Sequence, residues 1–245
     1  QKNNKTKVNE YQENLKIKLF DLILNFKPDL IWIGKGNGIY RSLLKEIRRK
    51  GINPPKIALW YGDIRDKVPE YFREFAGMVD FFFMSSFGKI FKKFSEAIEA
   101  PVNNYFIHPH NPMFDHFDAQ KKNVVGFTGR YYKSISCDER DFVHHELVKE
   151  NFFSIEENAV GMDYVRAINS FDFMLNVNNF VGEYLYTSDR LSHYLSCGAN
   201  IMLLDRDEGF EKLYPGCFIP FKNFNEIKFL IKKSYYTGEI AYRIM

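Results

Sequence analysis

The chain has little cysteine, and its cysteines are poorly placed to bind one another or a metal. Cys137, Cys197 and Cys217 are the only three in 245 residues, and no two form a Cys-x-x-Cys pair. An odd number of isolated cysteines argues against a disulfide framework and against a zinc site of the usual ligand spacing. The sequence therefore favours a reducing, cytoplasmic setting.

Long apolar runs and the common nucleotide-binding loops are also missing. No run approaches the roughly 18–20 residues of a membrane-spanning helix, and residues 1–14 do not resemble a signal peptide. The glycine-rich stretch 34–38 (GKGNG) is neither a Walker A loop nor a G-x-G-x-x-G fingerprint, which disfavours a dehydrogenase. Asp205–Asp207 (DRD) is a formal match to a metal-binding Asp-x-Asp, so this alternative stays open beside our expectation of no metal and no resident cofactor.

Charge is divided unevenly along the chain. Residues 1–118 hold 19 Lys or Arg against 14 Asp or Glu, and residues 119–245 hold 15 against 17, so the net charges are +5 and −2. The excess of positive charge in the first half points to an anionic partner, either a membrane surface or a phosphate-bearing acceptor. We expect no nucleic-acid partner.

Apolar strand-like runs alternate with helix-like periods, which predicts an α/β fold with two parallel, Rossmann-like sheets. The segment 108–123, rich in proline, asparagine and charge, breaks this pattern near Asp118. We therefore expect two domains, residues 1–118 and 119–245. The expected strands are 30–34, 56–61, 81–85, 104–108, 124–128, 173–177, 200–204 and 217–220, and the expected helices include 11–26, 40–50, 68–77, 87–98, 138–150, 160–170, 190–196 and 224–235.

In the first half, candidate polar groups follow predicted strands. Gly34, Lys35 and Gly36 form a loop whose backbone could approach an anion, although a tight turn explains it equally well. Asp63, at the next strand end, could be a general base for an acceptor hydroxyl or the N-cap of a helix. The same choice between base and loop residue applies to two histidines at another strand end, His108 and His110.

In the second half, two stretches are suited to a diphosphate. Gly129, Arg130 and Lys133 follow a strand, and an arginine can bind phosphate through two parallel hydrogen bonds. Thr187, Ser188 and Arg190 stand at the start of a predicted helix, where backbone N–H groups favour anions. The purely structural alternative is one more strand–helix unit.

The predicted helix 87–98 (FGKIFKKFSEAI) has an aromatic stripe with Lys89, Lys92 and Lys93 outside it. Such a helix could contact an anionic bilayer, or it could be an ordinary amphipathic helix that packs on its sheet.

Taken together, these motifs resemble the GT-B glycosyltransferases of the CgeB, or spore-maturation-protein, kind. The likeness is strongest at Thr187–Asp205 (TSDRLSHYLSCGANIMLLD) and is looser at KPDLIWIGKG, KIALWYGD, NYFIHPHNPMFDHF and LYPGCFIPFKNFNEIKFLIKKSYY. The resemblance implies two Rossmann-like domains facing across a cleft, and a sugar transferred from a nucleotide diphosphate, of UDP or GDP type, to a glycan, lipid-linked or protein acceptor of the cell envelope.

The resemblance also implies site roles. Gly129, Arg130 and Lys133 match one side of the family's diphosphate site, and Thr187, Ser188 and Arg190 match the other. His193 stands where many members have a ribose-binding Glu, and Leu185 replaces the first Glu of a paired motif. These departures keep a second hypothesis open, a non-catalytic GT-B protein that binds glycans or assists assembly; a nucleotide-linked epimerase is a third.

Overall fold

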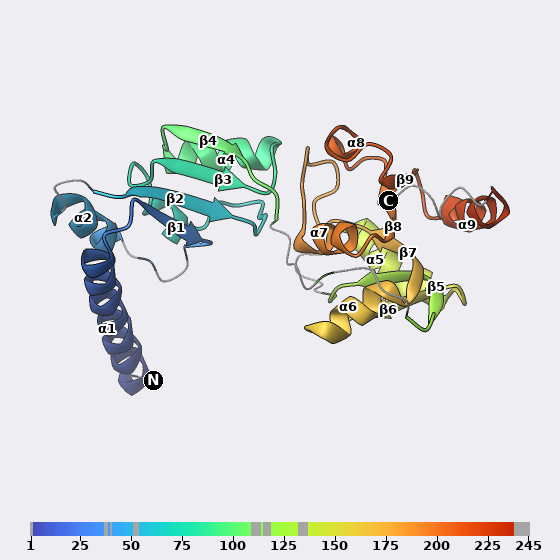
Figure 1. Ribbon diagram of the computed structural model, residues 1–245, viewed down its shortest axis with the longest axis horizontal. Coiled ribbons are helices and arrows are strands. Elements are labelled where there is room, and N and C mark those ends of the chain that lie inside the picture. Colours follow the sequence, from blue (N-terminus) through green and yellow to red (C-terminus); the bar gives the residue numbers. More distant parts are fainter. Residues whose placement is uncertain are drawn as a thin grey trace. The chain divides into compact units, whose positions relative to one another are not determined.

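The computed structural model describes residues 2–36, 39, 41–50, 54–108, 114, 119–131 and 137–237. His110 and Lys133, both expected in the site, lie outside these residues. The chain divides into two compact units, Gln1–Phe106 (unit 1) and Ile107–Met245 (unit 2), whereas the sequence placed the boundary near Asp118. Each unit contains one parallel sheet, as the sequence predicted (Figure 1).

Unit 1 is a four-stranded sheet in the order β1-β2-β3-β4, with all neighbours parallel. Its strands are apolar runs that follow helix-ending or turn residues, as expected for buried parallel strands. Its elements are α1 (Lys2–Phe26), β1 (Leu30–Gly34), α2 (Arg41–Lys50), β2 (Lys56–Tyr61), α3 (Glu70–Arg73), β3 (Phe81–Met84), α4 (Lys89–Ile98) and β4 (Val102–Tyr105).

One face of this sheet carries the core of unit 1. Alternate strand residues point to this face, and the helices between the strands bury them completely or nearly so. Aromatic rings from α3 and α4 pack on β2: Phe72 and Phe94 lie 5.1 and 5.2 Å from the ring of Tyr61. In Figure 1, α4 lies behind β3 and β4.

Unit 2 is a five-stranded parallel sheet in the order β6-β5-β7-β8-β9. The order reverses direction between β5 and β7, so the carboxyl ends of these two strands flank a topological switch point, where ligands of open α/β sheets bind. Its elements are β5 (Asn123–Thr128), α5 (Asp138–His145), η2 (Leu147–Lys149), β6 (Phe153–Glu156), α6 (Met162–Asn169), β7 (Phe171–Asn176), α7 (Asp189–Ser196), β8 (Asn200–Leu204), α8 (Phe210–Leu213), β9 (Phe218–Phe221) and α9 (Asn225–Thr237).

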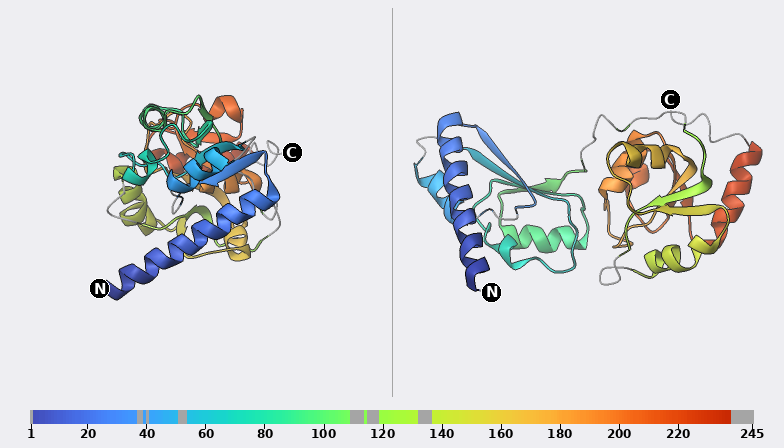
Figure 2. Two further views of the ribbon diagram at one scale, coloured as in Figure 1. Left: turned by 90° about the vertical axis from the view of Figure 1, so that its left-hand side faces the viewer. Right: turned by 90° about the horizontal axis from the view of Figure 1, so that it is seen from below.

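The core of unit 2 lies between the sheet and the helices α5 and α9 (Figure 2). Phe173, Leu175 and Val177 of the β7 segment pack there with Val143 of α5 and Ile227 of α9. The helices α6 and α7 bury their own apolar residues, which include Val165 and Leu191. Both faces of this sheet are therefore covered, as a parallel sheet requires.

Some element boundaries differ from those predicted. The fourth strand begins at Val102 rather than at residue 104, and the helix expected over residues 68–77 is reduced to Glu70–Arg73. The rest of that helix is replaced by turns, whose hydrogen bonds are donated by the backbone N–H groups of Glu74, Phe75, Ala76 and Met78. Gly77, in the same segment, has a positive φ of 66°. The short helix α8 was not predicted, because four residues are too few for a helical period to show.

Candidate functional site

At the carboxyl edge of the first sheet, the structure brings together two residues for which the sequence gave separate roles. Lys35 Nζ lies 2.8 Å from Asp63 Oδ2, and both side chains are about half exposed. They meet because β1 and β2 are parallel neighbours, so the loops after Gly34 and after β2 share one edge. Gly36 has φ +78°, and a Cβ there would lie 2.9 Å from the ring of Phe75, so this turn requires glycine.

At the carboxyl edge of the second sheet, Thr128 ends β5 and connects it to two helices. Its backbone N–H donates to Tyr194 Oη on α7 at 2.9 Å. Its Oγ1 lies 2.8 Å from the hydroxyl oxygens of Tyr194 and of Tyr164 on α6. Burial raises the pKa of both tyrosines, which keeps them neutral. This network holds α6 and α7 against the strand end.

Arg190, which the sequence placed at a diphosphate, is buried beside the same strand end. Its Nη1 donates to Thr128 O at 3.1 Å and its Nη2 to Val177 O at 3.0 Å, so one guanidinium joins the ends of β5 and β7. The guanidinium carbon also lies 4.8 Å from the ring centre of Phe127. A Cβ on Gly129 would lie 2.7 Å from Nη1, so glycine is required there.

A second buried arginine, Arg140 of α5, was not predicted. Its Nη2 donates to Arg130 O at 2.7 Å, and its guanidinium carbon lies 5.1 Å from the ring centre of Phe127. Burial, followed by the positive charge of Arg190, lowers the pKa of Arg140 to about 10, which still leaves it charged at neutral pH. Two cationic side chains therefore lie beneath the loop that follows β5.

Polar groups that follow β7 and β8 complete this buried cluster. Asn178 Nδ2 donates to Asp207 Oδ2 at 3.1 Å. Both amide atoms of Asn176, which is fully buried, have no hydrogen-bond partner among the described residues. Burial raises the pKa of Asp207 to about 7, although the hydrogen bonds from Gly182 and Asn178 oppose this shift. The cluster thus holds two guanidinium groups together with the carboxyl groups of Asp207, Glu139 and Asp189.

The stability of unit 2 is expected to depend on pH through Asp207. Its unfolded pKa is about 3.9, so between about pH 4 and pH 7 the folded state holds a proton that the unfolded chain has lost. Stability therefore falls as pH rises through this range, by roughly 3–4 kcal/mol. Asp207→Asn should remove this fall and be more stable than the parent at pH 8 but not at pH 4.

Urea unfolding at pH 4, 6 and 8 measures the difference. Asp205→Asn is the matched control, because Asp205 is exposed and lies two residues away. If Asp207→Asn and the parent keep parallel pH dependences, the buried carboxyl is not the cause.

The remaining donor-side residues lie around this cluster. Arg130 is exposed on the loop above Arg140, and Thr187 is buried. Ser188 is the N-cap of α7, with no side-chain capping hydrogen bond, and its buried Oγ has no partner among the described residues. Gly129 and Arg130 thus follow β5, and Thr187 and Ser188 lie at the start of α7, whose Arg190 joins the ends of β5 and β7. Lys133 lies outside the described part of the chain. Their role at a diphosphate remains a prediction.

Of the histidines predicted in the site, His193 lies on α7 and His108 contacts this helix. The ring of His193 stacks on Phe114, with the ring centres 4.0 Å apart and the planes 10° apart. Ser192 Oγ donates to the backbone oxygen of His108 at 3.2 Å, and both residues line a cavity of about 370 Å³. Phe114 thus covers one face of the His193 ring, whose nitrogens make hydrogen bonds in the plane of the ring.

Helix α4 packs its apolar side on the sheet, as the ordinary amphipathic alternative required. Phe94 and Ile98 are fully buried, while Lys89, Lys92 and Lys93 are exposed. Lys93 Nζ lies 3.2 Å from Asp66 Oδ1. The lysines are thus available to an anionic surface, but the aromatic stripe is mostly not.

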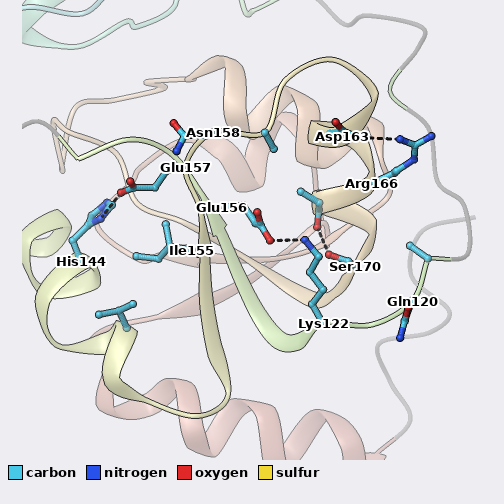
Figure 3. A pocket seen from close by; sticks show the side chains of 14 residues that line it. Gln120, Lys122, His144, Ile155, Glu156, Glu157, Asn158, Asp163, Arg166 and Ser170 are labelled. Atoms are coloured by element: carbon cyan, nitrogen blue, oxygen red, sulfur yellow. Dashed lines mark hydrogen bonds and ion pairs between the residues drawn. The ribbon is translucent and has the colours of Figure 1, made fainter.

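A larger cavity, of about 970 Å³, lies at the edge strand β6 and holds none of the predicted site residues (Figure 3). The charged side chains that line it pair with one another: Lys122 with Glu156 at 2.6 Å and Arg166 with Asp163 at 2.8 Å. His144 and Glu157 lie 3.4 Å apart on its other side. We therefore favour the cluster at Arg140 and Arg190, where two buried guanidinium groups lie beside the loop of Gly129 and Arg130, as the ligand site.

Sequence reasoning could have found Arg140. It lies three residues before Val143 and seven before Leu147, both buried, so it occupies the buried face of its helix. The charged run Asp138–Asp141 hid this pattern. Among the described residues, no group of three His, Cys, Asp or Glu side chains converges as metal ligands, and Asp207 of the DRD triplet is committed to Asn178.

No protein-family model matches the sequence, and no curated protein matches it either. Solved structures do resemble it. Sucrose-phosphate synthase of Thermosynechococcus elongatus has a TM-score of 0.56 at 11% identity, over 95% of this chain and 70% of that one. HepE of Anabaena in complex with UDP-glucose gives 0.54 at 11%, over 92% and 73%.

The structure of accessory secretory proteins 1, 2 and 3 of Streptococcus pneumoniae gives a TM-score of 0.52 at 10% identity, over 93% of this chain and 50% of that one. The chain thus spans between half and about three quarters of the length of these structures. No described helix is long and apolar enough to cross a membrane. With its two Rossmann-like parallel sheets and these neighbours, the chain has the fold of the GT-B glycosyltransferases.

Proposed function

We propose that this chain is a glycosyltransferase that binds a nucleoside-diphosphate sugar at the carboxyl edge of its second sheet. The observation that carries the proposal is the pair of buried arginines, Arg140 and Arg190, beneath the loop of Gly129 and Arg130. Fixed positive charge at a strand edge and a helix N-terminus stabilises a leaving diphosphate without the reorganisation that water would need. The finer assignment, to CgeB-like enzymes, rests on the sequence resemblance at Thr187–Asp205.

The chemistry requires a second function, removal of a proton from the acceptor hydroxyl late in the transfer. We assign this role to Asp63, His108 or His110. Asp63 forms an ion pair with Lys35, and an acceptor hydroxyl could approach its carboxylate by displacing the lysine. We propose a glycan, lipid-linked or protein acceptor, transfer without a metal ion, and a cytoplasmic location with peripheral contact through Lys89, Lys92 and Lys93.

Binding of UDP tests the donor site, and GDP is the second probe. UDP is the first choice because HepE was solved with UDP-glucose. We expect micromolar to millimolar binding by calorimetry, weakened at least tenfold in Arg130→Ala, since a lost charged hydrogen bond costs about 1.5–3 kcal/mol. Arg166→Ala, on the other cavity, is the control. If neither nucleotide binds the folded parent at millimolar concentration, the proposal fails.

A specific observation favours a second candidate, a non-catalytic GT-B protein that acts in assembly. Phe114 stacks on His193, at the position where the resemblance expects a ribose-binding Glu. A neighbour of the same fold belongs to a structure of three accessory secretory proteins. Nucleotide binding without sugar transfer or donor hydrolysis, over a panel of UDP- and GDP-sugars, would support this candidate.

A further inference from the structure

The sheet of unit 1 leaves one of its faces open. Parallel sheets bury both faces under helices, but here none of the described helices packs on the face opposite the core. Four apolar side chains on it stay 43–50% exposed, and three more are half-buried. We call this surface the open face; it consists of Leu30, Trp32, Trp60, Phe81, Phe83, Val102 and Phe106.

The open face is continuous rather than scattered. The ring centre of Trp32, on β1, lies 5.6 Å from that of Phe83, on β3, and 5.5 Å from that of Phe106, which follows β4. Trp60 Nε1 donates to the backbone oxygen of Phe106 at 3.3 Å. Ordinary protein surfaces expose apolar side chains singly, whereas this apolar surface is continuous across four strands.

The same unit also has a helix, α1, that leaves several large apolar side chains exposed. In the described part of α1, Leu15, Ile17, Leu22 and Leu24 are 43–61% exposed and Phe26 is 77% exposed. These exposed residues flank the half-buried Leu19, Phe20 and Ile23, so the apolar surface of the helix is wider than its contact with α2 covers. Figure 1 shows α1 projecting from unit 1.

Within one chain, the helix and the open face do not meet. The short link Lys27–Asp29 joins α1 to β1, and the helix contacts α2. Leu43, Leu44 and Ile47 bury α2 against the core, on the other face of the sheet. The helix is therefore directed away from the open face of its own chain.

We propose that two copies of this chain associate, with α1 of each copy packed on the open face of the other. The dimensions agree: Leu15–Phe26 of α1 spans about 18 Å, and four strands about 4.8 Å apart span about 14 Å. A two-fold axis makes this contact twice, which doubles the buried area. Lys56, which lies opposite Leu30 at the margin of the open face, is paired with Asp80.

Light scattering after size exclusion, and tryptophan emission, test the proposal on the full chain. We expect a mass of twice 29.0 kDa at micromolar concentration. The chain's only two tryptophans, Trp32 and Trp60, both lie on the open face, so their emission should shift to the blue as the dimer forms. A monomer at every concentration up to 100-fold above that of the assay, with unshifted emission, would overturn the proposal.

Charged substitutions locate the contact. Leu22→Asp on the helix and Val102→Asp on the open face should each raise the dissociation constant at least 100-fold. Phe229→Asp is the control, because this residue is 66% exposed in unit 2 and should leave the dimer intact. Far-ultraviolet circular dichroism must match the parent, so that loss of folding does not imitate dissociation.

Mixing the two variants distinguishes this arrangement from others. In a mixed dimer, the intact helix of Val102→Asp can pack on the intact face of Leu22→Asp, so one of two contacts returns. Partial recovery of a heterodimer is therefore expected. A dimer of the parent that the mixture does not restore would indicate helix-to-helix or face-to-face packing and would overturn the proposal.

Discussion

Replacing Gly126 with alanine is expected to destabilise unit 2 strongly. Gly126 lies in the middle of β5, and a Cβ there would lie 2.2, 2.4 and 2.6 Å from three ring atoms of Phe171. The closest atoms include Cγ, which a change of rotamer about the ring cannot move away. Overpacking costs 1–3 kcal/mol and occasionally more, and this overlap is severe, so we expect about 3 kcal/mol or more.

Urea unfolding measures the loss, and a second substitution tests its cause. Phe171→Ala removes the ring, so Gly126→Ala in that background should cost less than about 1 kcal/mol, a non-additive result. Gly34→Ala is the control: its Cβ would meet nothing within 4 Å. Additive losses in the double variant would show that strand flexibility, rather than contact with Phe171, explains the glycine.

The fold could be predicted from the sequence to the extent that periods of two or 3.6 residues were visible. β1, β2 and β8 have the expected bounds, because each is an apolar run between turn residues. β4 was predicted at residues 104–108 but spans Val102–Tyr105, since the polar Asn103 is untypical of a buried strand. The open face of unit 1 leaves no trace in such runs, because an apolar strand has the same pattern whether one face or both are covered.

The sequence assigned Gly129 and Arg190 to two sides of one diphosphate site. In the structure they are neighbours, since a Cβ added at Gly129 would lie 2.7 Å from Arg190 Nη1. The partners of Arg190 could not be predicted, because they are backbone oxygens 13 and 62 residues away in the chain. The bond between Asn178 and Asp207 joins two loops 29 residues apart for the same reason. Contacts of this kind depend on the completed sheet.

Replacing Arg190 is expected to lower both the stability of unit 2 and its affinity for a nucleotide diphosphate. The guanidinium satisfies Thr128 O and Val177 O, so Arg190→Met leaves two buried carbonyl oxygens without a donor. Each unsatisfied group costs about 1–3 kcal/mol, which predicts a loss of about 2–4 kcal/mol after relaxation. Arg190→Lys should recover little, because one ammonium group cannot reach both oxygens in the geometry of the planar fork.

Arg130 provides the comparison that separates binding from folding. Its side chain is exposed, and within the described part of the chain its backbone oxygen accepts a hydrogen bond from Arg140. Arg130→Ala should therefore bind UDP at least tenfold more weakly and melt within about 2 °C of the parent. Arg190→Met should lower the melting temperature by several degrees and, at a temperature where it remains folded, bind UDP about 100-fold more weakly.

Calorimetry at 10 °C, where both variants are folded by circular dichroism, measures the affinities without a contribution from unfolding. If Arg190→Met binds UDP as tightly as the parent there, Arg190 is only a structural connection between β5 and β7. The positive charge that the donor needs would then have to come from Arg130 and Arg140. If both arginine variants bind normally, the diphosphate lies elsewhere, and the paired charges of the cavity at β6 become the next site to substitute.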